Sequence, residues 1–399
     1  MLRAFLVSRW SEDPWSRGSW SLIGRGGSPA DRMTLGRPPG PRLRIAGEAT
    51  HTSRAGMTHG AYEKGREAAH WAADLGHRRV AVIGAGVAGL GAARHLTRLG
   101  VAAEVFEARD RPGGRAMSAE LDGCTFDLGA NWLQQYPENA LARIAERLGL
   151  RTIATDFADP LVFHGAPAPP GLAEAVTTKL GAAPVEASVA EVLRDPAPFA
   201  PEEVQRFAAA EIVMDAGAPL SWLSARHGIE PGVGQGDRWI AGGYRLLTDH
   251  LSRGLRVRTS SPVSHVATRE DGAYVQDTQF DAVLVTVPVG VLQAGTITFD
   301  PPLPEEHRAA LSRLGMGRVE KVVLRFGERF WPVVRSGYYR VHGPGADDIC
   351  EWLDASAADG VPTLVGLFAG PWLDGLWAGT DAEVAARAAD VIRRAVPAG

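Results

Sequence analysis

The sequence has little cysteine and no long apolar run. Cys124 and Cys350 are its only cysteines, too few for a disulfide framework and without the spacing of a metal site, so we expect neither. No stretch approaches the roughly 18–20 apolar residues that a membrane-spanning helix needs. The apolar run at 4–7 is too short for a secretory signal. We therefore expect no membrane partner and a cytoplasmic location.

The chain has no net positive charge, and lysine is scarce. The formal net charge of -4 argues against a nucleic-acid partner or a general membrane-surface partner. Among the 42 basic residues only Lys64, Lys179 and Lys321 are lysine. Because the chain prefers arginine so strongly, each of its lysines is a candidate for a specific role. With 45% hydrophobic and 22% charged residues, the composition is ordinary for a globular enzyme, and the length of 399 residues suggests two domains.

A glycine-rich loop near the first quarter of the chain carries the clearest motif. An apolar β-branched run at 80–83 meets Gly84, Gly86 and Gly89, a helical Ala/Leu-rich segment follows, and a second apolar run ends on Glu107. This is the strand–turn–helix–strand of a dinucleotide site. We expect the three glycines to make the tight turn, to let the backbone approach a pyrophosphate and to let helix and strand pack closely. The helix N-terminus favours phosphate, and Glu107 is placed to accept ribose hydroxyls.

The residues after this acid indicate which dinucleotide binds. Arg-Pro-Gly-Gly-Arg at 111–115 resembles the FAD-binding pattern of the glutathione-reductase-like flavoproteins, in which a second glycine pair and a basic side chain close on the pyrophosphate. An NAD site needs no such second clamp. We therefore predict FAD, with Arg109, Gly114 and Arg115 among its ligands.

Three segments ahead of the glycine loop extend the resemblance. They are W-S-E-D-P-W-S-R-G-S-W at 10–20, A-G-E-A-T at 46–50 and T-H-G-A-Y-E-K-G at 58–65. They resemble W-x-x-D-P-x-x-x-G-S-Y, A-G-E-x-T and x-H-G-A-x-x-S-G of the flavin amine oxidases, the monoamine and polyamine oxidases and their relatives. In that family these motifs form the C-terminal third, whereas here they precede the FAD motif. The chain is therefore expected to be circularly permuted.

Later segments resemble the same family in its usual order. They are F-D-L-G-A-N-W-L at 126–133, G-G-Y at 242–244 with Val263, F-D-A-V-L-V-T-V-P-V-G-V-L at 280–292, L-G-M-G-R-V-E-K-V-V-L-R-F at 314–326 and a helix at 381–394. The segment at 25–41 is rich in Gly, Pro and Arg, which predicts a loop. Strands are expected at 3–8 and 43–46, and a helix at 56–73.

The resemblance implies an α/β fold with two domains. One is an FAD-binding Rossmann-type (glutathione-reductase-like) domain, and the other is a substrate domain with a mixed or antiparallel sheet and helices. We assign 34–133 and 236–290 to the first, and 1–33, 134–235 and 291–399 to the second. If permutation has kept the fold, Met1 and Gly399 should lie close together, and 75–78 should join the upstream helix to the first Rossmann strand.

The resemblance also implies most of the site. The segment Gly129, Ala130, Asn131 and Trp132 approaches the flavin in the family. The start of a second helix around Gly47 and Glu48, together with Gly60, Ala61 and Val263, is expected to hold the ribityl chain and the pyrimidine carbonyls. Where some monoamine oxidases bind FAD through cysteine this chain has Ser19, so the FAD should be non-covalent.

Lys321 is the best candidate for a catalytic residue. It lies within an apolar strand pattern, where an unpaired ammonium is costly. The alternative is a strand lysine that reaches solvent or pairs with Glu320. In the family the lysine at this place holds a water against flavin N5. Trp20 stands at one of two aromatic-wall positions facing the flavin, and Met57 stands at the other, so the aromatic pair is incomplete.

The expected function is the FAD-dependent oxidation of a C–N bond, with hydride transfer from an amine to flavin N5 to give an imine. The acceptor is oxygen or another carrier, and the residues leave the oligomeric state open. Alternatives are a flavin desaturase or L-amino-acid oxidase acting on a specialised metabolite, and a non-catalytic flavoprotein scaffold. Gln134 and Gln135 stand where many polyamine oxidases carry an acidic or histidine residue, which argues against a polyamine substrate.

Overall fold

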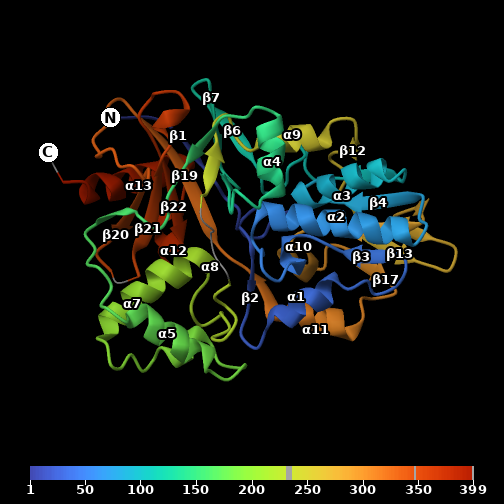
Figure 1. The fold of residues 1–399 in the computed structure, drawn as a ribbon, viewed down its shortest axis with the longest axis horizontal. Coiled ribbons are helices and arrows are strands. Elements are labelled where there is room, and N and C mark those ends of the chain that lie inside the picture. Colours follow the sequence, from blue (N-terminus) through green and yellow to red (C-terminus); the bar gives the residue numbers. More distant parts are fainter. Residues whose placement is uncertain (231–235, 346, 398–399) are drawn as a thin grey trace.

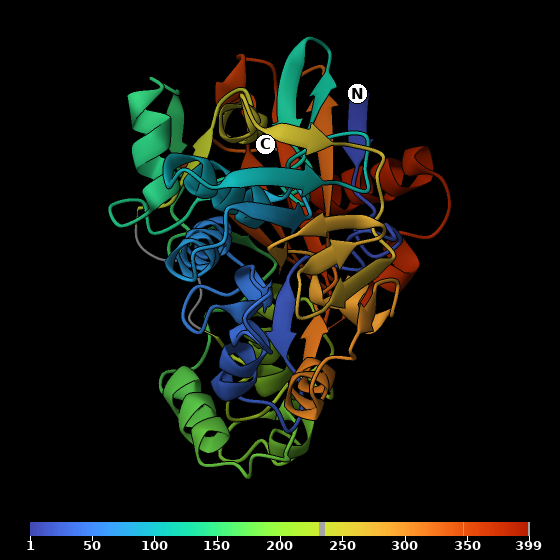
Figure 2. The same cartoon turned by 90° about the vertical axis from the view of Figure 1, so that its right-hand side faces the viewer.

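A parallel sheet and a larger mixed sheet organise this α/β protein (Figure 1). The computed structural model describes residues 1–230, 236–345 and 347–397. The five strands of the parallel sheet lie in the order β12 (Arg256–Arg258), β5 (Ala102–Phe106), β4 (Arg79–Ile83), β16 (Ala282–Val285) and β3 (Leu43–Ile45). Figure 2 shows the yellow β12, the teal β5 and the blue β4 side by side, although they come from distant parts of the chain.

Both faces of the parallel sheet are covered, which explains why its central strands are almost continuously apolar. Helices α2 (Thr58–Asp74) and α3 (Val87–Arg98) share one core with β4. The other face packs towards a smaller sheet, and Val283 and Val266 belong to that second core. The smaller sheet consists of β15 (Thr278–Phe280), β14 (Ala273–Val275), β13 (His265–Thr268) and β17 (Thr298–Asp300).

The mixed sheet joins the two ends of the sequence. Its strands lie in the order β1 (Leu2–Val7), β19 (Val319–Phe326), β22 (Thr363–Ala369), β21 (Ile349–Asp354), β20 (Tyr338–His342) and β10 (Leu161–Phe163). The first five pair antiparallel, and β10 joins β20 in parallel. All eight residues of β19 are buried, because β1 and β22 flank it and α13 (Asp381–Ala395) packs beside it. This matches the mixed or antiparallel sheet expected for the substrate domain.

Shorter elements complete the described part of the chain. The remaining strands are β2 (Ser21–Ile23) with β18 (Leu314–Met316), β6 (Ser118–Leu121) with β7 (Cys124–Asp127), and β8 (Trp132–Leu133), β11 (Arg238–Ile240) and β9 (Thr152–Ala154). The remaining helices are α1 (Pro29–Gly36), η1 (Glu48–Thr50), α4 (Ala140–Arg147), α5 (Leu172–Gly181), α6 (Val189–Val192), α7 (Pro201–Ala208), η2 (Ala209–Val213), α8 (Met214–Ala216), α9 (Arg245–Ser252), α10 (Val289–Gln293), α11 (Glu305–Arg313), η3 (Ser356–Ala358) and α12 (Trp372–Leu376). None of the helices described is long and apolar enough to cross a membrane.

One predicted loop contains a helix. Residues 25–41 include α1, which begins after Ser28 with Pro29 in the first turn. The backbone N–H of Ser28 donates to Asp31 at 2.8 Å, so the acid at the third helical position caps the helix. The Gly and Pro content suggested a loop, but the proline here is a helix-start residue.

The first and last described elements are neighbours. Helix α13 packs against β1, and both lie on the same side of the molecule in Figure 1. Helix α2 ends at Asp74 and β4 begins at Arg79, as expected for the connection at 75–78. The expectation for Gly399 falls outside the described residues.

Candidate cofactor and active site

The sequence-predicted site residues gather around one cavity of about 580 Å³. Those that line it are Trp20, Gly47, Glu48, Met57, Ala61, Gly84, Gly86, Glu107, Arg109, Gly114, Arg115, Gly129, Ala130, Asn131, Trp132, Val263 and Lys321. Gly60 and Gly89 do not line it. The cavity thus draws its walls from both large sheets and from the segments that precede the glycine loop.

The glycine loop has the expected backbone geometry. Gly84 turns with a φ of +99°, and α3 begins one residue after Gly86. A Cβ on Gly89 would stand 1.9 Å from the Gly84 carbonyl oxygen, so this glycine allows helix and strand to pack closely. A Cβ on Gly86 would meet nothing within 4 Å. The space beside Gly86 is therefore open to a ligand.

The second glycine pair closes directly on the first. The N–H of Gly113 donates to the Ala85 carbonyl at 2.8 Å, and a Cβ on Gly114 would lie 3.1 Å from the Gly86 Cα. Glu107 is buried and accepts the Ala85 N–H at 2.7 Å, which fixes its carboxylate beside the loop. Arg109 donates to Asp13 at 2.8 Å, so the W-x-x-D-P segment lies against this end of the cavity.

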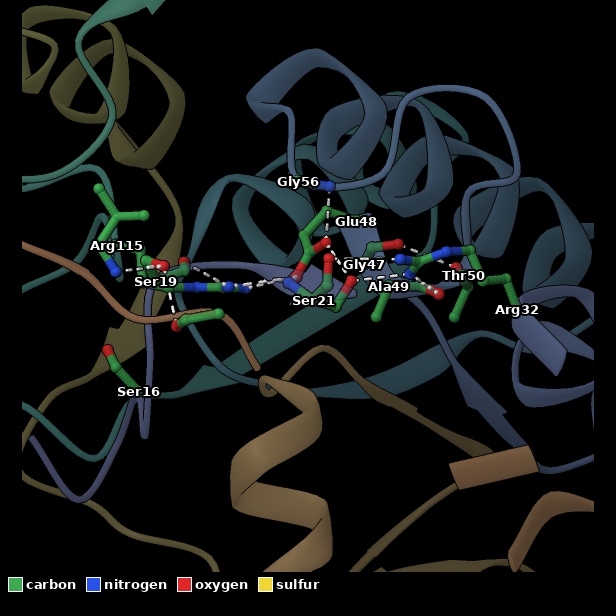
Figure 3. Close-up of polar contacts among 12 residues, drawn as sticks. Ser16, Ser19, Ser21, Arg32, Gly47, Glu48, Ala49, Thr50, Gly56 and Arg115 are labelled. Carbon is green, nitrogen blue, oxygen red and sulfur yellow. Dashed lines mark hydrogen bonds and ion pairs between the residues drawn. The ribbon is translucent and has the colours of Figure 1, made fainter. Parts of the chain in front are cut away.

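Glu48 is the centre of a buried polar network (Figure 3). Its carboxylate accepts the Ser21 hydroxyl at 2.6 Å, the Gly56 N–H at 2.8 Å and the Arg115 guanidinium at 3.1 Å. Burial alone would raise the pKa of Glu48. The guanidinium groups of Arg115 and Arg32, with these hydrogen bonds, hold the pKa below its ordinary value. Glu48 therefore stays ionised and joins four segments of the chain.

This network changes two sequence-based expectations. Arg115 was expected to close on the pyrophosphate, but the buried carboxylate of Glu48 engages its guanidinium. The Gly47–Glu48 segment begins only η1, a single 3₁₀ turn, whereas the long helix α2 starts at Thr58. Gly60 packs on the Arg54 carbonyl, which a Cβ would approach to 2.1 Å, so its role is close packing beside the cavity.

Lys321 points into the cavity from the middle of β19. Its Nζ donates to the Gly129 carbonyl at 2.6 Å and lies 4.9 Å from the centre of the Trp132 ring. Burial lowers the pKa of Lys321 to about 8, and the opposite charge of Asp127 limits the shift. Glu320 points elsewhere, since it accepts the backbone N–H groups of Trp10 and Ser11. Lys321 therefore neither reaches solvent nor pairs with Glu320.

The two wall positions face the same cavity. Trp20 is held by a hydrogen bond from its Nε1 to the Asp215 carbonyl at 3.0 Å, and Met57 is buried just before α2. Ser19, at the place of the cysteine in covalent family members, donates its hydroxyl to the Gly317 carbonyl at 2.9 Å. The chain thus offers no thiol at that position.

Sequence reasoning missed a group of carboxylates in the cavity wall. They are Glu211, Asp215, Glu230 and Glu351, accompanied by Arg340. They come from separate elements and carry no shared motif, so only the fold brings them together. One local signal existed, because Glu211 and Asp215 stand four residues apart in an alanine-rich helical stretch. These carboxylates weaken the argument against a polyamine substrate that Gln134 and Gln135 suggest.

Comparisons with known proteins identify the family. The family described as flavin containing amine oxidoreductase matches residues 3–70, 87–222 and 230–399. The probable polyamine oxidase 4 of Arabidopsis thaliana is 31% identical over 339 residues, which are 73% of this chain and 66% of that protein. Lysine-specific histone demethylase 2 of Homo sapiens is 30% identical over 300 residues, 65% of this chain and 36% of that protein. The chain spans about two thirds of the length of the plant relatives and a smaller share of the demethylase.

Solved structures share the fold. A putrescine oxidase bound to putrescine superposes with a TM-score of 0.65 at 22% identity, over 80% of this chain and 81% of that one. The cyclohexylamine oxidase of Brevibacterium oxydans IH-35A gives a TM-score of 0.64 at 22% identity, with the same coverage. This chain is a member of the flavin containing amine oxidoreductase family.

FAD is accordingly the cofactor, and the described residues fit it. The open space beside Gly86, at the N-terminus of α3, would receive the pyrophosphate, and Glu107 would receive ribose hydroxyls. Asn131 lines the cavity with a buried Nδ2 that has no partner among the residues described, as expected where a ligand supplies the acceptor. With Ser19 in place of a cysteine, the cofactor is held without a covalent bond.

Proposed function

We propose that this protein oxidises the C–N bond of an amine to an imine, using FAD. Bound FAD accepts a hydride equivalent from the carbon next to nitrogen. One observation carries the proposal: the cavity that fits FAD continues past Lys321 and two tryptophans, Trp20 and Trp132. An apolar aromatic wall lowers the pKa of an amine by desolvation and so favours its neutral, reactive form.

The residues around Lys321 have two tasks in this proposal. The Gly129 carbonyl accepts a hydrogen bond from the ammonium at 2.6 Å and so fixes its position, and the Trp132 ring lies beside it. We propose that Lys321 places a water molecule against the flavin and adjusts the electrostatics there. Oxygen or another carrier then takes the electrons.

The cavity argues against an amino-acid substrate. A substrate carboxylate needs a cation that is not already engaged. In this proposal Lys321 acts at the flavin, and Arg340 is paired with Glu211 and Glu351. Arg109 and Arg115 are paired with Asp13 and Glu48. The surplus of carboxylates favours a cationic substrate instead, and polyamine and putrescine oxidases are among the relatives.

We further propose that the parallel sheet is a Rossmann-type FAD domain in a circularly permuted chain. The family matches residues 3–70 as a segment of their own, ahead of the glycine loop. In the structure β3 and α2 of this segment pack with β16 and α3. The packing of α13 beside β1 supports the same proposal.

Anaerobic reduction tests the activity. The FAD-bound protein is mixed with a panel of primary and secondary amines, amino acids and matched alcohols, and its flavin absorbance is followed. We expect bleaching by amines, no bleaching by the alcohols, and an imine-derived aldehyde or ketone as the product. Bleaching by amino acids alone would instead favour the amino-acid oxidase, and persistent oxidised flavin would favour the scaffold.

A further inference from the structure

A second cavity lies on the other side of the segment that carries Glu48. It measures about 250 Å³, and its lining comes from α1, β3, η1 and α2. Helices α1 and α2 both pack against η1, and Figure 1 shows α1, β3 and α2 close to one another. Ile45, Ala46 and Thr50 line both cavities. The second cavity therefore shares a wall with the cavity that fits FAD.

Three cationic side chains line this second cavity, and each comes from a different element. Arg37 follows α1 directly, Arg44 lies on β3 and Lys64 lies on α2. The side chain of Arg44 is only 12% exposed and that of Lys64 is 24% exposed. Cations that are so far withdrawn from water are costly unless anions bind them. The cavity is thus built to hold negative charge.

Glu67 is the one carboxylate among the described residues that line this cavity. It binds the Arg44 guanidinium and accepts a hydrogen bond from the Lys64 ammonium at 2.7 Å. Burial alone would raise the pKa of Glu67, but Lys64 and Arg44 hold the pKa below its ordinary value, so the carboxylate is ionised. Arg37 reaches Glu306 outside the cavity at 3.4 Å, and water screens this pair because both side chains are more than half exposed. The lining therefore carries three positive charges and one negative charge.

Lys64 is one of only three lysines in the chain. Lys321 points into the flavin cavity, and Lys179 forms an exposed pair with Asp195. Lys64 stands where the family motif x-H-G-A-x-x-S-G has serine. A serine here would leave Glu67 to Arg44 alone and would remove one positive charge from the cavity. The lysine thus creates the surplus of positive charge.

The size and lining of the cavity limit what it can bind. A volume of about 250 Å³ is smaller than that of cavities for drug-sized ligands, so only a small molecule fits. A phosphate monoester carries about −1.5 to −2 charges at neutral pH, close to the surplus of the lining. Its phosphate presents three oxygens to cations from three directions, which a planar carboxylate cannot do. Met33, Pro38 and Ile45 offer an apolar side to the rest of such a molecule.

We propose that this second cavity binds a small phosphate monoester, whose phosphate group is held by Arg37, Arg44 and Lys64. Glu67 sets the spacing of Arg44 and Lys64 and competes with the phosphate for both of them. The site is separate from the flavin and from the amine substrate, so this inference does not depend on the proposed oxidation.

Calorimetric titration tests this site. Ethyl phosphate, inorganic phosphate and propionate are titrated at constant ionic strength into wild type, Lys64→Gln, Glu67→Gln and Lys179→Gln. The FAD-bound protein is used, so that the pyrophosphate position beside Gly86 does not bind the probes. Lys179 lines neither cavity, so its variant controls for the loss of one positive charge. Bound FAD per chain and the melting temperature of each variant are the controls for folding.

We expect wild type and Lys179→Gln to bind one ethyl phosphate per chain with the same affinity. Lys64→Gln should bind it at least about tenfold more weakly, the loss of one charge-assisted hydrogen bond. Glu67→Gln should bind it more tightly than wild type, because the competing carboxylate is gone.

Three results would overturn the proposal. The first is no saturable binding of ethyl phosphate to wild type, and the second is equal affinity in wild type and Lys64→Gln. The third is binding of propionate or of inorganic phosphate as tight as that of ethyl phosphate, which would assign the cavity to a carboxylate or to the free anion. Weaker binding to Glu67→Gln than to wild type would contradict the competing role of Glu67.

Discussion

At the scale of single residues, the charge of Lys321 is the feature on which the chemistry depends most. Its buried ammonium is held by one carbonyl and one aromatic ring, so a methionine could replace its volume but not its proton. We expect Lys321→Met to keep FAD and to slow flavin reduction or reoxidation roughly a hundredfold, the cost of losing one well-placed donor. Stopped-flow traces measure both steps. Lys179→Met, at an exposed ion pair outside the cavity, is the control.

The pH profile gives a second test of the same residue. Burial lowers the pKa of Lys321 to about 8, so the ammonium is mostly charged at pH 7 and loses its proton as the pH rises through 8. We expect wild type to show an ionisation near this pH in the flavin steps that Lys321→Met lacks. If the substrate amine alone caused the inflection, the variant would retain it.

Glu48 is predicted to matter for stability. Its lowered pKa means that the ionised form stabilises the fold above pH 4.5, and this stabilisation is lost as the pH falls through the folded-state pKa. Glu48→Gln should reduce the free energy of unfolding by about 3–5 kcal/mol at pH 7, the cost of breaking a buried pair, and by less in acid. Urea unfolding at both pH values measures this difference. Glu12→Gln at the exposed Arg9 pair should cost about 0–1 kcal/mol.

The sequence alone predicts only some of the residues that line this cavity. Lys321 could be found because it interrupts an apolar strand, and the loop glycines because their spacing is local. Asp215, Glu351 and Arg340 could not, because they meet only after α8, β21 and β20 are folded together. The pairing of Arg115 with Glu48 was missed for the same reason, since 67 residues separate them.

At the scale of elements, the junction of β4 and α3 gives a contrast between two glycines. Gly89→Ala places a methyl group 1.9 Å from the Gly84 carbonyl and should separate helix from strand, whereas Gly86→Ala directs a methyl group into open space. We expect Gly89→Ala to lower the melting temperature of the protein even without FAD. Gly86→Ala should leave that melting temperature nearly unchanged and should weaken FAD binding. Equal effects on melting would contradict the assigned roles.

The elements also show where sequence patterns mislead. The strand–turn–helix at 79–98 follows from apolar runs and glycine spacing, and the structure confirms it. The Gly, Pro and Arg content at 25–41 predicts a loop, but Ser28, Pro29 and Asp31 together form the start of helix α1. The sequence around Gly47 and Glu48 does not distinguish a single 3₁₀ turn, which the structure has as η1, from the start of a second helix.

At the scale of the whole molecule, the proposed circular permutation can be tested by joining the two ends of the chain and opening it elsewhere. The packing of α13 beside β1 motivates joining 397 to 1 by a short linker. We expect a chain joined there and opened within 75–78 to fold, to bind FAD and to react with the same amines. The measurements are the FAD bound per chain and the melting temperature of the rejoined protein, each compared with the original chain. Failure to bind FAD, with linkers of several lengths, would contradict the permuted arrangement.

The central claim concerns the bond that is oxidised, and an isotope effect tests it most directly. FAD-bound protein is mixed anaerobically with the best amine of the panel and with the same amine carrying deuterium on the carbon next to nitrogen. If C–H cleavage beside nitrogen drives flavin reduction, bleaching by the deuterated amine will be several times slower. Equal rates of bleaching, or none with any amine, would contradict the account.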